Sequence, residues 1–303
     1  MLLTGDRPAA KSLCEPMPGH MDLPRLLEAR VGLQFFALFT IPSHDAGANL
    51  RRILEMITQF HRSAAESEGR LRPVLTASDV DPREGTVGGL LAIEGLSAIG
   101  GSVEVLEALH RLGVRSAMLT WNERNDLADG ALEQTSGGGL SSGGRRIVQA
   151  MQRLNMVLDV SHLGEQGFWS LLEASEGPFI ASHSNARAVH DHPRNLRDEQ
   201  LKALKARGGV VGMNFYTQFL VPEEPATLDD LLRHIRYIAD LIGPEYIGLG
   251  SDFDGISAWP EGLGGVQDYG NLRSALTAAG FSDVESEGIL GGNLRRVLRK
   301  VLA

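Results

Sequence analysis

The sequence predicts a single (β/α)₈ barrel, the TIM barrel, as the fold of this chain. Eight short apolar runs alternate with amphipathic stretches over almost all of its 303 residues, and strand and helix alternating eight times is the pattern of such a barrel. The run ends are also rich in His, Asp and Glu, which favours a barrel with chemistry at its mouth. A doubly wound open sheet is the alternative, but no Gly-x-Gly-x-x-Gly follows the first run. The runs end near Asp22, Phe39, Glu94, Trp121, His162, His183, Asn214 and Asp252.

Length and composition describe an ordinary globular protein. The chain is 43% hydrophobic and 22% charged, which provides ample core. Because barrels of about 250 residues routinely form one domain, we expect a single domain over residues 1–303. A short segment, about residues 1–18, is expected to be irregular.

Charge, cysteine content and hydropathy exclude several classes of function. The formal net charge is −9, and the one basic cluster is a helix face at Arg295 to Lys300, which argues against a nucleic-acid partner. Cys14 is the single cysteine, so any metal must be held by His, Asp and Glu. No stretch approaches the ~18 apolar residues of a membrane span, and the first twenty residues lack the apolar region of a secretory signal. We therefore expect a cytoplasmic protein.

The first run, residues 15–22, is poor strand sequence because Pro16 and Pro18 cannot donate to a central ladder. His20 and Asp22 nevertheless alternate as residues on one face of a strand would. By itself a His-x-Asp pair is weak evidence for a site. The pair is of interest because it lies in the first of the eight runs.

The second and third runs give a core strand and a candidate ligand. Residues 33–39 are apolar almost throughout, as a barrel strand should be. Residues 88–95 place Glu94 at the end of an apolar run, where a buried carboxylate without a partner is costly. Glu94 therefore needs a cation, either a metal ion or an arginine.

The fourth run ends at Trp121 and is followed by a polar, glycine-rich stretch, residues 123–142. A long loop on the mouth side of a barrel is where segments that face the substrate are found.

The fifth and sixth runs each end in a histidine. Asp159-Val160-Ser161-His162 follows one run, Ala181-Ser182-His183-Ser184 follows the next, and residues 165–175 have the length of a crossover helix between them. Adjacent parallel strands would bring both imidazoles to one rim, where they form half of a metal site. Two core histidines bonded to backbone carbonyls are the alternative.

Two further polar residues lie on the expected rim. Arg194, in the loop after the sixth run, suits a carboxylate clamp because guanidinium binds carboxylate through two parallel hydrogen bonds. Asp252 ends the last run and could carry a proton during catalysis. His190 and His192 are assigned to surface or supporting roles. Further helices are expected at residues 49–65, 103–112, 145–154, 198–207 and 228–242.

This set of segments resembles the renal (membrane) dipeptidase family of binuclear zinc metallopeptidases, bacterial branch. The matching segments follow the family order with fitting spacings, from about His20 to the carboxyl terminus. They are Gly19-His20-Met21-Asp22, Ile93-Glu94-Gly95, Leu119-Thr120-Trp121-Asn122, Asp159-Val160-Ser161-His162, Ser182-His183-Ser184, His192-Pro193-Arg194-Asn195, Asn214-Phe215-Tyr216 and Gly250-Ser251-Asp252-Phe253-Asp254-Gly255.

The resemblance implies a metal-dependent hydrolase with two Zn²⁺ ions per chain. By position, His20 and Asp22 match ligands of one zinc, His162 and His183 match ligands of the other, and Glu94 matches the carboxylate that bridges them. The resemblance also implies that Asp252 is the catalytic acid/base, and that Arg194 binds the terminal carboxylate of a dipeptide substrate, with Trp121 beside it. Family members tolerate D-residues at the carboxyl-terminal position, so such dipeptides are expected here.

Two departures from the family pattern stand out. Trp121 stands where the animal enzymes carry a histidine that contacts the substrate, and indole donates a hydrogen bond but does not titrate. The segment between the His-x-Asp pair and the second run is also short. Two alternatives to a dipeptidase stay open: another metal-dependent barrel amidohydrolase acting on a cyclic amide, lactone or phosphoester, and a silent relative that binds peptide or metal. A homodimer is left open as well.

Overall fold

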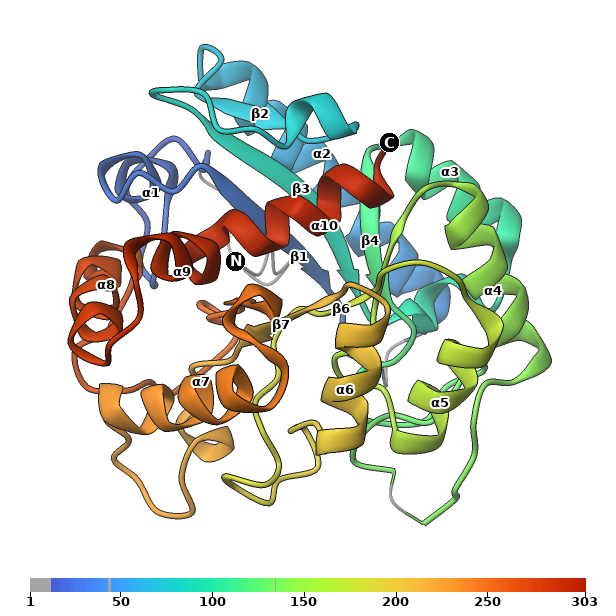
Figure 1. Cartoon of the computed structure of the whole chain (residues 1–303). Coiled ribbons are helices and arrows are strands. Elements are labelled where there is room, and N and C mark those ends of the chain that lie inside the picture. The colour runs from blue at the N-terminus through green and yellow to red at the C-terminus, as the bar shows by residue number, and fades with distance from the viewer. Residues whose placement is uncertain (1–11, 43–44, 134) are drawn as a thin grey trace.

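The computed structural model describes residues 12–42, 45–133 and 135–303, and its centre is a curled parallel sheet of eight strands. The helices form a ring outside this sheet, and α10 lies across the strands in front (Figure 1). The strands are β1 (Leu33–Phe39), β2 (Leu71–Pro73), β3 (Val87–Glu94), β4 (Val114–Met118), β5 (Val157–Asp159), β6 (Ile180–Ala181), β7 (Val210–Met213) and β8 (Ile247–Leu249). The predicted barrel class is confirmed.

Strand pairing follows the order β1-β3-β4-β5-β6-β7-β8, and every pair is parallel. The short strand β2 pairs with the start of β3, and β4 pairs with the end of β3. Among the described residues no pairing joins β1 to β8, so the barrel has an open seam between these two strands. All carboxyl ends lie at one rim because the strands are parallel, as the sequence required.

The helices are α1 (Leu23–Glu28), α2 (Ala46–Glu66), α3 (Val103–Arg111), α4 (Ser142–Arg153), α5 (Glu165–Ala174), α6 (Asp198–Ala206), α7 (Leu228–Ile242), α8 (Tyr269–Ala278), α9 (Asp283–Glu287) and α10 (Asn293–Val301). Several begin at a side-chain cap. Ser102 accepts from the third backbone N–H of α3, and Thr227 does the same for α7. Such caps satisfy backbone donors that the first turn leaves free. The six helices expected from periodicity agree with the structure to within three residues.

The apolar core has two layers. The larger one lies between the sheet and the helix ring, with residues such as Phe36, Phe60 and Phe168. The smaller one fills the barrel, where Leu90 and Ala92 of β3 meet residues of the other strands and of α10. Because side chains alternate along a strand, the residue two beyond Ala92 also belongs to the inward face.

Two expectations about strands are wrong. Residues 15–22 contain no strand; Pro16 and Pro18 lack the N–H that a ladder needs, and Asp22 begins a helix instead. The additional strand is β2, which periodicity missed because it is three residues long and ends in Pro73. Of the amino-terminal segment expected to be irregular, residues 1–11 lie outside the described part, and residues 12–18 contain no helix or strand.

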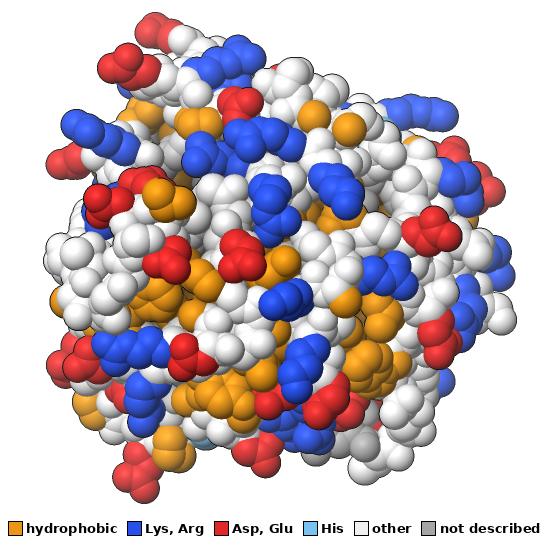
Figure 2. Space-filling model, in the orientation of Figure 1, with side chains coloured by type: hydrophobic (Ala, Val, Ile, Leu, Met, Phe, Trp, Pro, Cys, Tyr) orange, Lys and Arg blue, Asp and Glu red, His pale blue; other side chains and the backbone are white. Residues whose placement is uncertain are grey.

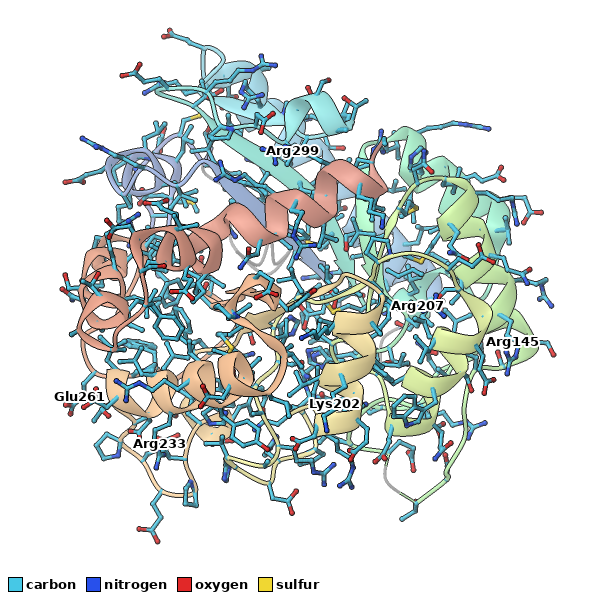
Figure 3. The ribbon with its side chains drawn as sticks, in the orientation of Figure 1. Arg145, Lys202, Arg207, Arg233, Glu261 and Arg299 are labelled. Carbon is cyan, nitrogen blue, oxygen red and sulfur yellow. The ribbon has the colours of Figure 1, made fainter. Side chains whose placement is uncertain are left out.

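The visible surface has no large region of a single charge. Figure 2 shows acidic and basic side chains interspersed over this face. Of the charged residues labelled in Figure 3, Arg145 lies on α4, Lys202 on α6 and Arg233 on α7, whereas Glu261 lies outside the helices.

Candidate active site

The carboxyl ends of β3, β5 and β6 bring Glu94, His162 and His183 together. Glu94 is the last residue of β3, on the inward face of that strand. His162 lies three residues beyond β5 and has a left-handed backbone, with φ of 66°. His183 lies two residues beyond β6. All three are buried, and one ligand atom from each lies within 4.8 Å of the others.

The two imidazoles are oriented with their Nε2 atoms toward each other. His162 Nε2 lies 2.9 Å from His183 Nε2 and 3.1 Å from Glu94 Oε1. On the opposite side of the rings, His162 Nδ1 donates to Asn122 Oδ1 at 2.8 Å, and His183 Nδ1 bonds Ser182 Oγ at 2.7 Å. A hydrogen bond at Nδ1 fixes the tautomer and leaves the Nε2 lone pair free for a metal.

These three residues fit a metal ion better than a shared proton. Burial, and then the charge of Arg194, lowers the pKa of His162 and of His183 well below the ordinary value, so neither ring is readily protonated. Two converging lone pairs beside a buried carboxylate leave a site that a divalent cation would satisfy. Their donor set of two nitrogens and one oxygen is common for zinc and similar metals.

Asp159 fixes both histidine-bearing segments, a role that sequence reasoning did not assign. Its Oδ1 accepts from the backbone N–H groups of Ser161 and Ser182, both at 3.0 Å. Ser161 Oγ in turn accepts from the backbone N–H of His183 at 3.0 Å. Burial raises the pKa of Asp159 to about 6, although the hydrogen bonds from Ser161 and Ser182 act to lower it. The Asp-x-Ser-His spacing is the signal in the sequence that could have indicated this role.

Asp252 lies beside the cluster and is not one of its three members. Its backbone is left-handed, with φ of 61°, and its Oδ2 accepts from Asn214 Nδ2 at 3.1 Å. Removal from water and then the charge of Glu94 raise the pKa of Asp252 to about 7, against the Asn214 hydrogen bond and the charge of Arg194. A carboxyl group with a pKa near neutrality can both accept and release a proton.

Arg194 is buried behind the cluster. Its Nη2 donates to the His183 carbonyl at 3.3 Å, and its guanidinium lies 5.3 Å from the centre of the Phe219 ring. Burial lowers the pKa of Arg194 to about 10, against the charges of Asp252, Glu94 and Asp159. Within the described residues its Nε has no hydrogen-bond partner. An unpaired buried donor of this kind is costly, and an anionic ligand would satisfy it.

Trp121 packs against the cluster. Its ring centroid lies 6.0 Å from that of His162 and 5.2 Å from that of Phe39. Burial raises the pKa of Glu94 to about 7, while Arg194 and an indole hydrogen bond from Trp121 lower it. Trp121 is therefore in contact with the group that would hold the metal.

His20 and Asp22 lie outside the three-residue cluster. Asp22 caps helix α1, and its carboxylate also pairs with Arg25. His20 bonds Asp254 in the loop after β8 and stacks on Phe253. The structure thus brings together only part of the ligand set that the sequence suggested.

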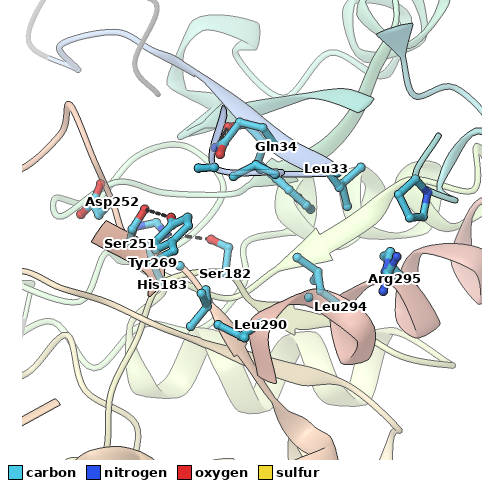
Figure 4. Close-up of a pocket in the computed structure, with 18 of the residues that line it drawn as sticks. Leu33, Gln34, Ser182, His183, Ser251, Asp252, Tyr269, Leu290, Leu294 and Arg295 are labelled. Carbon is cyan, nitrogen blue, oxygen red and sulfur yellow. Dashed lines mark hydrogen bonds between the residues drawn. The ribbon is translucent and has the colours of Figure 1, made fainter. Parts of the chain in front are cut away.

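A cavity of about 740 Å³ occupies the open seam between β1 and β8. Asp252 and His183 lie at one end of it and Arg295 at the other, with Leu33, Leu290 and Leu294 among the residues between them (Figure 4). The cluster therefore borders this cavity on one side and the loops of the rim on the other.

Comparison with known proteins decides which family has this site. The family model described as Membrane dipeptidase (Peptidase family M19) matches residues 4–303. The chain belongs to the membrane dipeptidase family. The predicted family is confirmed, and membership makes the chain a hydrolase of the metallo-dipeptidase type.

Relatives within the membrane dipeptidase family agree in sequence and in structure. Dipeptidase aclJ of Aspergillus oryzae is 36% identical over 296 residues, which cover 93% of this chain and 70% of the relative. The crystal structure of dipeptidase AC, a metallopeptidase, is 32% identical, with a TM-score of 0.88, and 94% of this chain and 90% of that chain are covered. A metallopeptidase from Rhodobacter sphaeroides, solved with a phosphinate mimic of the dipeptide L-Ala-D-Ala, is 30% identical, with a TM-score of 0.86 and coverage of 94% and 91%.

The family name refers to a membrane, but no helix in the described part of this chain has the length and apolar character needed to cross one. The family match and the Glu94, His162 and His183 cluster together indicate metal binding.

Proposed function

We propose that this chain hydrolyses the peptide bond of dipeptides at a metal centre formed by Glu94, His162 and His183. The observation that carries the proposal is the position of Arg194. A buried guanidinium with a free Nε donor lies directly behind a cluster whose histidine lone pairs converge. Such a site can hold a carboxylate and a carbonyl of one small molecule at the same time.

The metal would supply a polarised carbonyl and a bound water whose pKa falls from 15.7 to roughly 7. Asp252 is the candidate proton carrier in this reaction. Its carboxylate accepts the proton of the attacking water and passes it to the leaving amine, which departs as the free amino group of the second residue. Asn214 holds the Asp252 carboxylate in place through its side-chain amide.

Arg194 would bind the terminal carboxylate of the substrate. The free Nε and the Nη atoms of one guanidinium can form two parallel hydrogen bonds with a carboxylate. Because that group would be fixed close to the metal centre, only a short peptide would place its scissile carbonyl correctly. Trp121 would line the same space.

Dipeptides with a D-residue at the carboxyl-terminal position are the finer part of the proposal. Support comes from the Rhodobacter sphaeroides relative, whose ligand is a mimic of L-Ala-D-Ala. Zinc as the metal, and two ions per chain bridged by Glu94, remain predictions, as do the cytoplasmic location and a homodimer. The count of two ions would require His20 and Asp22 to act as ligands.

A panel of substrates on metal-loaded protein tests the function. L-Ala-L-Ala and L-Ala-D-Ala should be cleaved, cleavage should stop with a chelator, and activity should return when the metal is restored. Carboxyl-amidated dipeptides and tripeptides should be cleaved poorly. Turnover of a cyclic amide, lactone or phosphoester in place of dipeptides would contradict the proposal, and so would metal-loaded protein without any dipeptide turnover.

A further inference from the structure

The seam between β1 and β8 is bounded by two strand edges that face each other. On one side, the carbonyl of Gly32, just before β1, accepts from the backbone N–H of Gly88 in β3 at 3.0 Å. On the other side, the backbone N–H of Gly250, just after β8, donates to the carbonyl of Met213 in β7 at 3.0 Å. Because a parallel ladder uses alternate residues on each edge of a strand, the even-numbered residues bond to β3 and β7, and the odd-numbered residues of β1 and β8 face the seam.

Side chains satisfy only part of these two edges. Gln34 Nε2 donates to the carbonyl of Phe35 at 2.7 Å, and Asn293 Nδ2 donates to the carbonyl of Ile247 at 2.8 Å. Three other odd-numbered residues have no backbone partner at the seam within the described part of the chain, namely Leu33, Ala37 and Leu249. Backbone donors and acceptors withdrawn from water need partners, and a strand lying in the seam would supply them to both edges.

The cavity in the seam is longer than a dipeptide. It is lined on β1 from Leu33 to Ala37, a stretch that spans about 16 Å at about 3.3 Å per residue. A dipeptide extends over about 7 Å at most, so it would occupy less than half of this length. An extended segment of about five residues matches the lined stretch of β1.

The lining favours a peptide over a purely apolar molecule. Leu290 and Leu294 form part of an apolar wall along the cavity (Figure 4). An apolar molecule would contact this wall but would leave the backbone groups of β1 and β8 unpaired. A peptide in extended conformation offers side chains to the wall and its own N–H and C=O groups to the strand edges, which is how peptides add to a sheet.

Charge gives the bound peptide a direction. Arg295 lies at the end of the cavity away from Asp252 (Figure 4), and it forms no hydrogen bond or ion pair with the described residues. The nearby Arg273 is instead paired with Glu287 at 2.5 Å. Asp252 and Glu94 place carboxylates at the opposite end of the cavity. A peptide with its carboxyl end at Arg295 and its amino end toward the carboxylates is complementary to both ends.

We propose that the cavity in the seam binds an extended peptide of about five residues, which forms a strand between β1 and β8 and places its terminal carboxylate at Arg295. This binding site goes beyond the proposed function, which needs only the residues of the rim.

Calorimetric titration of the metal-loaded full chain with the pentapeptide Ala-Val-Ala-Val-Ala tests the inference. One peptide should bind per chain. Amidation of the peptide carboxyl group should weaken binding about tenfold, because it removes a hydrogen bond between charged groups. Methylation of both valine nitrogens should weaken binding by at least about tenfold, because it removes donors that a strand needs to pair with its neighbours.

Substitutions on α10 test the position of the peptide carboxylate. Arg295→Gln should weaken binding of the free acid about tenfold and should abolish the difference between the acid and the amide. The control is Arg299→Gln on the same helix, because Arg299 pairs with Asp81 and does not line the cavity. This variant should bind both peptides as the unaltered chain does.

Three results would overturn the inference: no binding of the pentapeptide, equal binding of the methylated peptide, or an acid–amide difference that persists in Arg295→Gln. The first is also the result expected if a segment of this chain or of a second copy fills the seam. The titration needs no turnover. A chain that binds the peptide but hydrolyses no dipeptide would therefore contradict only the proposed function, and an active dipeptidase that does not bind it would contradict only this inference.

Discussion

Replacement of Asp252 by asparagine removes a proton carrier from the active site and leaves its shape almost unchanged. Asparagine has the size of aspartate, and its side-chain oxygen can still accept from Asn214 Nδ2, which lies 3.1 Å from Asp252 Oδ2. Asp252 is not one of the three clustered ligands, so the metal should stay bound. The change therefore separates proton transfer from metal binding.

The expected loss follows from the protonation behaviour of Asp252. Its pKa of about 7, raised first by removal from water and then by Glu94, is close to the value that suits a group which must accept and release a proton at neutral pH. General acid/base catalysis contributes roughly 10²–10⁴ in rate. At about 1.36 kcal/mol for each factor of ten, Asp252→Asn should raise the barrier by about 3–5 kcal/mol. The effect should be in kcat, with KM nearly unchanged.

The assay is steady-state hydrolysis of L-Ala-D-Ala with elemental analysis of the same samples. Asp81→Asn is the control, because this exposed carboxylate pairs with Arg299 and lies outside the ligand cluster. It should retain kcat within a few-fold. If Asp252→Asn loses metal, Asp252 is a ligand; if it keeps nearly full turnover, it carries no proton. Either result refutes the reasoning.

Three further results are expected. Arg194→Met should raise KM for dipeptides by a factor corresponding to about 2–5 kcal/mol and should reduce the preference for dipeptides over amidated dipeptides. The control Arg187→Met, which removes an exposed ion pair, should change neither KM nor this preference. An unchanged preference in Arg194→Met would show that Arg194 does not bind the substrate carboxylate. Glu94→Gln should weaken metal binding more than His183→Gln in an equilibrium metal titration, because Glu94 is the charged member of the three clustered residues; equal affinities would contradict this. Burial lowers the pKa of His234 to about 4, so the unfolded state binds the proton more readily than the folded state. The free energy of unfolding should therefore fall by about 3 kcal/mol as the pH drops from 6.5 to 4. His234→Asn should reduce this dependence of the free energy of unfolding on pH, measured by urea unfolding at a series of pH values, and an unchanged dependence would exclude the effect.

The sequence by itself determined the alternation of strands and helices and three of the site residues. Glu94, His162 and His183 each follow a short apolar run, and the runs lie in a repeating strand-helix pattern. Hydrophobic periodicity and chain direction are local properties, so they can be read along the chain. The parallel arrangement then placed all three residues at one rim.

The pair His20 and Asp22 shows where local pattern is ambiguous. A His-x-Asp spacing fits one face of a strand, but Asp followed by Leu-Pro-Arg also fits a helix cap with proline in the first turn. The second interpretation is the one the structure has. Both patterns are present in the sequence, and Pro16 and Pro18 favour the helix cap over the strand.

Tertiary structure alone decided which side chains meet. The partner of His162 Nδ1 is Asn122, which is 40 residues away, and His20 meets Asp254 across 234 residues. Asp159 joins the two histidine segments through hydrogen bonds to Ser161 and Ser182. A hydrogen bond depends on distances of about 3 Å and on orientation, and these are set when distant segments pack together. Periodicity along the chain contains no such information. The strands, the helices and the rim at which the strands end could therefore be predicted, but the hydrogen-bond partners of each candidate ligand could not.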